Sequence, residues 1–478
     1  MGSNHLLGIL AYSLRDRAEN EFLSVRQDFS PEAGIILIME VVHAKHPKSE
    51  CLSTGYPAPK MPKTTGLKAL IHNFHSPYYY VYLYILLSTI SGAAKIAAGR
   101  LRGKDDSMQF SMNAQDLLDG LNTVTRALSA RPAKQILEGV LMDVNEDGIV
   151  LTCSDGSLSI QSIIRSDVKE VGRAVLPGRL FTELARKLPG GEVNIKVGDN
   201  HAATIRCMSS RSNLSGMNPM EYPEMAEVSE GTMIRIPQNK LKEMISRVVF
   251  AIATDESRQI LTGCLLEVTA EEARLVALDG FRLAMQTAKM PFELPEGVET
   301  LKAVIPGRVL NELSKILTDE EADCILTFDK NRMQASFGNT VLSSVLLAGE
   351  YIDYRKILPP AFKTQAKADR VSVQNAIDRA SLMAREGKNN LIRLSFTENG
   401  LAITSNAELG DVLEEMEAQL DGDPIEIAFN AKYITDVIRN ISDDQMCMKF
   451  NSNVSPCVVT PENGEGYLYL ILPVRVFQ

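Results

Sequence analysis

The sequence predicts an α+β protein made of three tandem copies of one domain, each with two helices packed on antiparallel sheets. The first observation is a long-range repeat: AVLPGRLFTEL begins at Ala174 and AVIPGRVLNEL begins at Ala303, 129 positions later. Short solenoid repeats recur every 20–50 residues, so this spacing is that of a whole domain. The second is length, because 478 residues are enough for about three or four domains. A hydrophobic content of 45% and a charged content of 23% are ordinary for a globular protein.

An amphipathic helix is predicted at the start of each copy. Apolar residues recur there at spacings of 4, 3 and 4, which place them on one face of an α-helix. The three sets are Leu117, Leu121, Val124 and Leu128, then Leu241, Ile245, Val248 and Ile252, then Val373, Ile377, Ala380 and Ala384.

A β-rich passage follows each of these helices. The passages begin ILEGVLMDV at Ile136, ILTGCLLEV at Ile260 and LIRLSFTENG at Leu391. Apolar residues alternate around the turns NEDG, TAEE and TENG, and Asp-Gly and Asn-Gly are hairpin signals. The pairs Asp155-Gly156 and Asp279-Gly280 are predicted to form turns as well.

The repeated Pro-Gly-Arg motif then ends a strand and begins a second helix. Proline fits the first helical turn, where its missing N–H is not needed. The third copy, IAFNAKYITDVIRNI, lacks Pro-Gly but has Lys432 where the others have Arg179 and Arg308. Two copies also share a tyrosine-centred joint, MEYPEM and EYIDYRKILP. The predicted domains are 108–229, 230–358 and 359–478.

Residues 1–107 do not follow this plan. They carry a net charge of +3, against −13 for residues 108–478. Their apolar stretch SPYYYVYLYILLSTISGAA could span a bilayer, which takes roughly 20 apolar residues. Because the preceding residues show no pattern and Met108 opens the patterned region, we favour a non-native start upstream of Met108, or a disordered extension. A membrane anchor and an unfamiliar soluble extension are the alternatives.

Composition argues against several kinds of site. Five of the six histidines lie in the first 107 residues, which makes a zinc site or a histidine base improbable in the rest. The seven cysteines lie far apart without a CxxC pair, as expected for reduced thiols in a cytosolic protein. With no P-loop and no GxGxxG turn, we expect no catalytic site, no metal and no cofactor. The net charge of −10 argues against a simple basic nucleic-acid coat.

Several segments resemble one family, the bacterial beta sliding clamp, which is the beta subunit of DNA polymerase III. They are QILEGVL, SDGSLSI, LPGRLFTELARKLPGG, FAIATDESRQILTG, ALDGFRLA, IPGRVLNEL, YIDYRKILP and LILPVRV. The resemblance runs continuously over 108–478. It implies a head-to-tail homodimer, a closed ring of six similar domains around double-stranded DNA, and a role as a replication processivity factor in the cytoplasm. The implied partners are the replicative polymerase alpha subunit, the clamp loader, and other polymerases and repair proteins that carry short linear motifs.

DNA contacts are expected from basic residues that recur by position in the repeat. Contacts to phosphate set affinity without reading sequence, and helix N-termini favour phosphate as well. The candidates are Arg131, Lys134, Arg258, Arg385 and Lys388 in loops, Arg179, Arg308 and Lys432 at the second helices, and Arg126 and Arg247 on the first helices.

The resemblance also implies a peptide-docking cleft between the second and third domains. Its residues are carried over by position: Leu261, Leu278, Gly280, Phe281, Arg282, Leu283, Ile352, Lys356, Ile357, Leu470, Leu472, Pro473, Val474, Arg475 and Val476. Phe281 stands where some relatives have a polar residue, and Phe477-Gln478 extend beyond the usual end. Both departures bear on which motifs bind.

The resemblance implies that Leu214, Leu382 and Met383 lie at the dimer interface. Ser212 occupies a place where an aromatic residue can occur, which weakens the expected joint. Two rival functions stay open at this point. One is a β-rich hydrolase with paired carboxylates, although no acid pair stands out. The other is a β-rich scaffold that binds only protein, which predicts neither a ring nor affinity for DNA.

Overall fold

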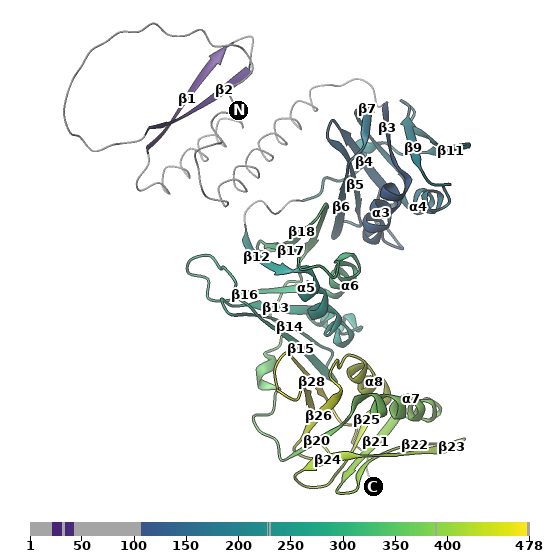
Figure 1. Cartoon of the computed structure of the whole chain (residues 1–478), viewed down its shortest axis with the longest axis vertical. Coiled ribbons are helices and arrows are strands. Elements are labelled where there is room, and N and C mark those ends of the chain that lie inside the picture. Colours follow the sequence, from purple (N-terminus) through teal and green to yellow (C-terminus); the bar gives the residue numbers. More distant parts are fainter. Residues whose placement is uncertain are drawn as a thin grey trace, which may run out of the picture. The chain divides into compact units, whose positions relative to one another are not determined.

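The computed structural model describes residues 107–226, 228, 231–387 and 390–475 in full, and the backbone of two strands near the N-terminus. The chain divides into two compact units, Met1–Arg102 and Gly103–Gln478. In the first unit, β1 (Phe22–Ser30) pairs antiparallel with β2 (Gly34–Val42), in a region where the sequence showed no pattern (Figure 1). The apolar stretch SPYYYVYLYILLSTISGAA lies outside the described residues. Among the residues that are described, no helix is long and apolar enough to cross a membrane.

The second unit repeats one order of elements three times: a strand, a helix, four or five strands, a helix and three strands. The first copy contains β3 (Met108–Asn113), α3 (Ala114–Val124), β4 (Gly139–Asn145), β5 (Gly148–Ser154), β6 (Leu158–Ile164), β7 (Asp167–Glu170), β8 (Gly172–Pro177), α4 (Gly178–Arg186), β9 (Glu192–Val197), β10 (Ala202–Cys207) and β11 (Ser210–Ser215). The second contains β12 (Thr232–Pro237), α5 (Gln238–Ser246), β13 (Gly263–Val268), β14 (Glu272–Leu278), β15 (Arg282–Lys289), β16 (Leu301–Pro306), α6 (Gly307–Ile316), β17 (Asp323–Phe328), β18 (Arg332–Phe337) and β19 (Thr340–Val345).

The third copy contains β20 (Thr364–Asp369), α7 (Arg370–Glu386), β21 (Leu391–Thr397), β22 (Gly400–Ala407), β23 (Gly410–Met416), β24 (Ala418–Asp421), β25 (Ile425–Asn430), α8 (Ala431–Arg439), β26 (Gln445–Phe450), β27 (Cys457–Thr460) and β28 (Tyr467–Ile471). Short 3₁₀ turns join these elements: η2 (Thr125–Ala127), η3 (Gln135–Glu138), η4 (Pro219–Glu221), η5 (Val249–Ala251), η6 (Glu256–Thr262) and η7 (Tyr354–Lys356).

The structure corrects the sequence prediction at the start of each copy. A strand, not a helix, comes first, because β3, β12 and β20 precede their helices directly. The first two helices are also shorter than the apolar spacing implied. Leu128 and Ile252 lie beyond α3 and α5, each at the end of a 3₁₀ turn. Only α7 carries its whole predicted set, with Val373, Ile377, Ala380 and Ala384 buried on one face.

Close packing explains why the chain repeats Pro-Gly at the second helix. Pro177 and Pro306 are N-caps that end β8 and β16, one position earlier than the predicted first turn. The glycines that follow have no room for a side chain. A Cβ on Gly178 would lie 2.7 Å from the side chain of Leu128, and a Cβ on Gly307 would lie 2.7 Å from that of Ile252. The third copy caps α8 differently, since the Asn430 side chain accepts a hydrogen bond from the backbone N–H of Lys432 at 3.0 Å.

Two continuous sheets cross from one copy to the next. An eight-stranded sheet runs β12-β17-β18-β19-β6-β5-β4-β8, and β19 pairs antiparallel with β6. A nine-stranded sheet runs β16-β13-β14-β15-β28-β27-β26-β20-β24, where Leu283 of β15 faces Leu470 of β28. Figure 1 shows that the helix pairs α3/α4, α5/α6 and α7/α8 follow one another along one side of this unit. The copies are therefore joined by backbone pairing, with their helices on a common side.

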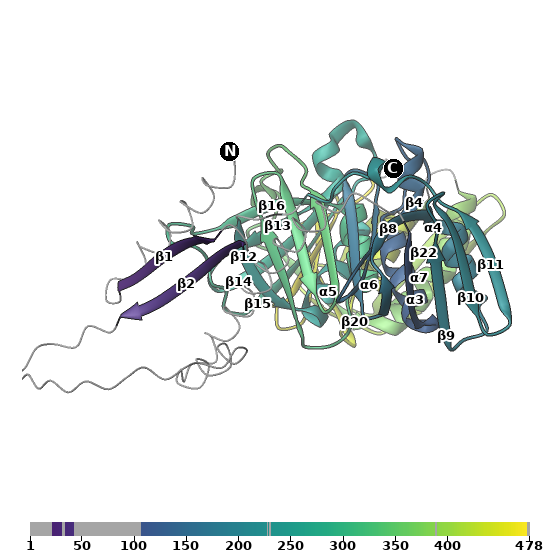
Figure 2. The same ribbon diagram turned by 90° about the horizontal axis from the view of Figure 1, so that it is seen from above.

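Two further sheets lie wholly within the first and the third copy, and each has an edge strand at either side. The five-stranded sheet β11-β10-β9-β3-β7 ends on β11, and the four-stranded sheet β23-β22-β21-β25 ends on β23. Seen from above, β9, β10 and β11 follow one another to the outer edge (Figure 2). Each edge presents backbone donors and acceptors that could pair with another chain.

The repeated tyrosines fix the segments that connect the copies. The Tyr222 hydroxyl lies 3.4 Å from the carbonyl oxygen of Thr152 on β5. The Tyr351 hydroxyl lies 3.3 Å from the carbonyl oxygen of Val276 on β14. Because β5 and β14 hold the same place in their copies, the two tyrosines perform the same task.

Candidate functional site

The predicted basic loop residues are exposed on short segments beside the helices. Arg131 and Lys134 lie between η2 and η3, Arg258 lies in η6, and Arg385 lies in the last turn of α7. No ion pair engages these four side chains within the part of the chain that is described. Lys388 is outside the described residues. Four cationic side chains are thus available to an anionic surface.

The basic residues at the second helices differ from one another. Arg179 and Lys432 are exposed, and Arg179 donates only to the carbonyl oxygen of Ser129, at 3.1 Å. Arg308 instead pairs with Asp155 of the first copy, and it donates to the carbonyl oxygens of Ala127 and Leu128 at 3.3 Å. Arg308 therefore braces the joint between the first and second copies.

Arg126 and Arg247 lie just beyond the helices to which they were assigned, Arg126 in η2 and Arg247 at the C-cap of α5. Each makes contacts across a joint. Arg126 pairs with Glu312 of the second copy at 3.3 Å. Arg247 donates to the Ser442 hydroxyl at 2.9 Å and lies over the ring of Tyr467, both in the third copy. A phosphate contact at either position has to compete with these bonds.

The predicted cleft residues on the strands form a buried apolar cluster. Leu261, Leu278, Leu283 and Leu470 are at most 3% exposed and pack together. Ile352 of the connecting segment packs against them from the surface. These leucines come from both copies, so the cluster lies at the joint between the second and third copies.

An exposed apolar rim borders this cluster. Phe281 is 55% exposed, and Ile357 and Leu472 are each 37% exposed. The Phe281 ring stacks on the ring of Tyr433 in α8, with centroids 5.4 Å apart. Tyr433 was not predicted from the sequence. Its position in the repeat could have identified it. Tyr433 follows Lys432, whereas in the other copies the aliphatic residues Leu180 and Val309 follow the corresponding arginines.

Arg282 is buried next to this apolar rim and contacts residues of the second and third copies. Its side chain is 6% exposed and pairs with Asp279 at 3.0 Å and with Asp436 of α8 at 2.6 Å. It also donates to the carbonyl oxygen of Phe250, and its guanidinium lies 4.9 Å from the ring centroid of Tyr433. Each of its three nitrogens makes a hydrogen bond and the side chain is buried, so Arg282 mainly positions Phe281 and Tyr433.

The end of the described chain closes one side of the cleft. The Leu472 N–H donates to the Phe281 carbonyl oxygen at 2.8 Å, and the Val474 N–H donates to the Ala428 carbonyl oxygen at 2.8 Å. Pro473 and Val474 are half-buried and Arg475 is exposed. Val476, Phe477 and Gln478 are outside the described residues.

The remaining cleft positions are open to solvent. Gly280 has a φ of 92°, and a Cβ at this position would meet nothing within 4 Å. Its role is the tight turn between β14 and β15, since few side chains tolerate that φ. Lys356 is exposed and pairs with Asp353 at 3.2 Å.

The corresponding joint between the first and second copies has serines at three positions where the second joint has apolar side chains. Ser154, Ser157 and Ser159 stand where the second copy has Leu278, Phe281 and Leu283. The hydroxyls of Ser154 and Ser159 bond to each other at 2.8 Å. At these positions the second joint has the apolar surface that suits a short peptide motif, and the first has polar side chains.

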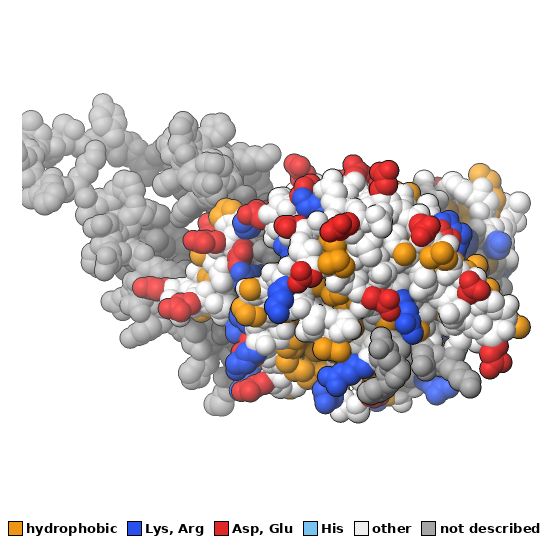
Figure 3. Space-filling model, turned by 90° about the horizontal axis from the view of Figure 1, so that it is seen from below, with side chains coloured by type: hydrophobic (Ala, Val, Ile, Leu, Met, Phe, Trp, Pro, Cys, Tyr) orange, Lys and Arg blue, Asp and Glu red, His pale blue; other side chains and the backbone are white. Residues whose placement is uncertain are grey.

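The predicted interface residues lie on the edge strand β11 and on α7, which packs against the edge strand β23. Leu214 is half-buried on β11, Leu382 on α7 is 57% exposed, and Met383 is half-buried. Beside β23 the structure adds two residues that the sequence did not single out, Leu409 at 79% and Leu413 at 59% exposed. Figure 3 views the end of the unit that contains the third copy, and it shows apolar patches among charged side chains of both signs.

Among the described residues, no group of three or more His, Cys, Asp or Glu side chains is placed to hold a metal ion. The six described cysteines are unpaired and buried. Burial raises the pKa of the Cys153 and Cys264 thiols, so these groups are poor nucleophiles.

Comparison with known proteins gives one consistent family. Three family profiles match in order: the N-terminal domain of the DNA polymerase III beta subunit over residues 108–226, its central domain over 235–353, and its C-terminal domain over 355–475. A protein from Staphylococcus aureus named beta sliding clamp is 33% identical over 380 residues, which cover 77% of this chain and all of that protein. The Staphylococcus epidermidis protein of the same name is similar to the same extent.

Solved structures agree with the profiles. The DNA polymerase sliding clamp from Bacillus subtilis is 34% identical, with a TM-score of 0.74, and the match covers 77% of this chain and all of that one. The DNA polymerase III beta subunit from Thermotoga maritima is 26% identical, with a TM-score of 0.72 and the same coverage.

Proposed function

This chain belongs to the family of the DNA polymerase III beta subunit, the beta sliding clamps, and we propose that it acts as a DNA sliding clamp. As a replication processivity factor, it encircles duplex DNA and keeps the replicative polymerase on its template. One observation within the chain supports this function best. Basic side chains that make no ion pair among the described residues recur at or after the end of the first helix of each copy, while the three copies are linked by continuous sheets.

A basic lining suits a ring that must slide. Arg131 and Arg258 follow the first helices of their copies, and Arg385 lies in the last turn of the first helix of the third copy. Side chains of this kind bind phosphate without reading base sequence, and the contacts are weakened by salt. The net charge of −10 is compatible with DNA binding, because the basic side chains are grouped locally and acidic groups can lie elsewhere on the molecule.

We further propose a closed homodimer. Head-to-tail contacts between unlike surfaces give a ring when the rotation closes. The free edges β11 and β23 lie in the first and third copies, so each could pair with the other edge of a second chain. Leu214 on one side and Leu382, Met383, Leu409 and Leu413 on the other would supply the apolar contacts.

The cleft between the second and third copies is proposed to bind short motifs of partner proteins. The expected partners are the polymerase alpha subunit, the clamp loader, and other polymerases and repair proteins, all in the cytoplasm. Phe281, Ile357 and Leu472 offer apolar surface above a buried cluster. A few anchors of this type usually carry most of the binding energy of a peptide.

The DNA side can be tested with Arg131→Ala/Arg258→Ala. We expect weaker, still sequence-independent DNA binding, because two phosphate contacts are lost. The plot of log affinity against log salt should become less steep by about 1.8, at about 0.9 per contact. Thermal melting should be unchanged, since neither side chain is buried.

A matched control removes two arginines that are already paired. Arg173→Ala/Arg393→Ala loses the same charge from β8 and β21, where these residues pair with Asp143 and Glu426. DNA binding should stay near that of the unaltered protein. Equal losses in the two double variants would refute the proposed contact residues, and a complete lack of DNA affinity would favour a protein-only scaffold.

A further inference from the structure

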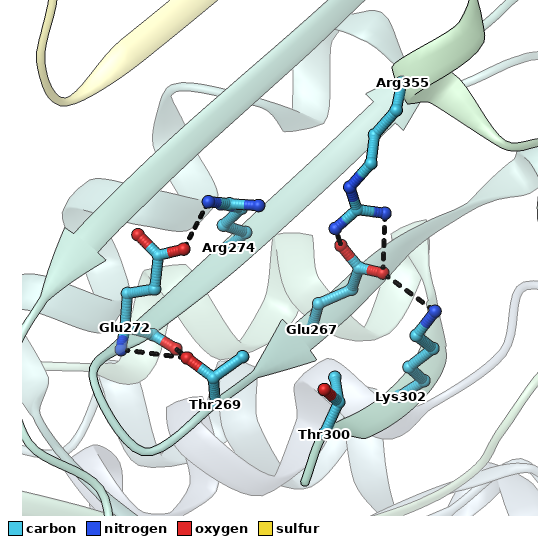
Figure 4. A pocket seen from close by; sticks show the side chains of 7 residues that line it. All are labelled: Glu267, Thr269, Glu272, Arg274, Thr300, Lys302 and Arg355. Atoms are coloured by element: carbon cyan, nitrogen blue, oxygen red, sulfur yellow. Dashed lines mark hydrogen bonds and ion pairs between the residues drawn. The ribbon is translucent and has the colours of Figure 1, made fainter.

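A charged pocket lies on the second copy, away from the helices. It has a volume of about 140 Å³ and is lined by Glu267, Thr269, Glu272, Arg274, Thr300, Lys302 and Arg355. Figure 4 shows Glu267 at its centre, with the side chains of Arg355 and Lys302 directed at its carboxylate. Neither the DNA contacts nor the apolar cleft uses this pocket.

The pocket lies on the same face of the sheet as the buried apolar cluster below the cleft. Leu265, Val276 and Val304 face one another across β13, β14 and β16, and they belong to the buried apolar cluster. Two residues further along each strand, Glu267 faces Arg274 and Lys302. Side chains two apart lie on one face of a sheet, so this charged row is about 7 Å beyond the apolar row.

On the other side of the apolar row, Leu278 faces Leu283 at the cleft. From that pair to the charged row is about 13 Å, or four strand residues. Four or five extended residues of a bound peptide can cover this length. The connecting segment spans the same interval, because Ile352 and Ile357 border the cleft while Arg355 borders the pocket.

The acceptors of the pocket are more fully occupied than its donors. The Glu267 carboxylate is 4% exposed and receives bonds from the Tyr354 hydroxyl at 2.7 Å, from Arg355 at 2.6 and 3.3 Å, and from Lys302 at 3.2 Å. Burial alone would raise the pKa of Glu267, but these bonds outweigh burial and lower it. Glu267 therefore stays ionised and has no lone pair left for a ligand.

The donors, by contrast, are in excess. Arg274, Lys302 and Arg355 carry three positive charges against two negative charges on Glu267 and Glu272. Arg274 pairs with Glu272, and the single carboxylate of Glu267 faces both Arg355 and Lys302. Lys302 and Arg355 are 60% and 50% exposed, so their remaining N–H groups reach solvent. The pocket has a net charge of +1 and open donors.

We propose that this pocket is an accessory site that binds an acidic side chain of a peptide whose apolar motif occupies the cleft. The inference rests on the proposed docking function and adds a specificity element to it. A carboxylate on the peptide bonds to Lys302 and Arg355 without displacing Glu267. Exposed ion pairs are worth up to about 1 kcal/mol, so the acidic side chain should improve affinity by up to about fivefold.

The test uses calorimetry on the full chain. The probes are peptides from the motif segment of the polymerase alpha subunit, extended at either end by four Gly or Ser residues and a terminal-amide Glu. Matching peptides carry Gln in place of Glu. At one of the two ends, the Glu peptide should bind more tightly than the Gln peptide, by up to about fivefold. Lys302→Gln should remove this preference, because it removes the excess charge and leaves the Glu267–Arg355 pair.

Lys315→Gln is the control, since this exposed lysine of α6 pairs with Glu312 and lines neither the pocket nor the cleft. The preference for Glu should survive in this variant. Equal binding of Glu and Gln peptides at both ends would overturn the proposal, as would equal loss of the preference in both lysine variants. In either case, binding of the Gln peptides would show that the cleft still docks its motif, so failure of the accessory site is distinct from failure of the cleft.

Discussion

Arg282 shows how a single residue determines the shape of the cleft. The sequence placed it among the ligand-contacting residues, but the structure buries it between Asp279 and Asp436, below Phe281 and Tyr433. Asp279 comes from the turn before β15 and Asp436 from α8 of the next copy. One guanidinium therefore joins two copies and supports the aromatic rim.

Substitution of this residue should be costly. In Arg282→Met the aliphatic part of the side chain is retained, but two carboxylates lose their partner at a buried position. Removal of one member of a buried pair costs about 3–5 kcal/mol, and the partial exposure of Asp436 at 29% favours the lower end. We expect a clear fall in thermal stability and weaker peptide binding, measured by calorimetric melting and titration.

Lys356→Met is the control for this variant, because Lys356 is exposed and pairs only with Asp353 among the described residues. Its melting temperature should match that of the unaltered protein. If Arg282→Met melts as the control does, the guanidinium does not brace the joint and our account of the rim is wrong.

The partners of several arginines could not be predicted from the sequence. Arg126, Arg247 and Arg308 look like solvated surface charges when read along the chain. Their partners Glu312, Ser442 and Asp155 are 186, 195 and 153 positions away. Such contacts depend on how the copies meet, which local spacing does not encode. Arg131 and Arg258 are exposed and make no long-range ion pair with another described residue, so their exposure could be predicted from the local sequence.

At the scale of elements, the three copies share one order of helices and strands but differ in the lengths of these elements. Alternating apolar residues and Asp-Gly turns were sufficient to predict the hairpins around β5, β14 and β22. The ends of α3 and α5 were not predictable, because Leu128 and Ile252 continue the apolar spacing into 3₁₀ turns. There they contact Gly178 and Gly307 of the second helices. The spacing of the apolar residues therefore reflects both the helix itself and the packing of the 3₁₀ turn that follows it.

The C-terminal segment is the element on which peptide docking depends most directly. Deletion of residues 472–478 leaves β28 complete to Ile471 but removes Leu472 and the bonds to Phe281 and Ala428. Truncation of one anchor typically costs about 2 kcal/mol, which corresponds to roughly a thirtyfold loss in affinity. We expect at least this loss for a polymerase-derived peptide in calorimetry.

The deletion should leave the oligomeric state unchanged in gel filtration, because the free edges β11 and β23 are separate elements. Ser157→Ala at the corresponding turn of the first joint serves as the control, with no change in peptide affinity expected. Unaltered peptide binding by the folded deletion variant would show that the cleft lies elsewhere.

At the scale of the whole molecule, the repeat itself was the most informative feature. A motif repeated at domain spacing predicted three copies, and the profiles of the DNA polymerase III beta subunit match the chain in three consecutive segments. The sequence did not show that strands of neighbouring copies form common sheets, since β19 pairs with β6 and β28 with β15 across long stretches of chain. That pairing links each copy to the next through backbone hydrogen bonds.

A closed ring holds DNA by topology, so the shape of the DNA should decide whether the protein stays bound. The most direct measurement compares retention on nicked circular DNA with retention on the same DNA after linearisation, following loading by the clamp loader. In buffer with enough salt to weaken phosphate contacts, the protein should remain on the circles and be lost from the linear molecules. Equal retention on both forms, or equal loss from both, would contradict a sliding clamp.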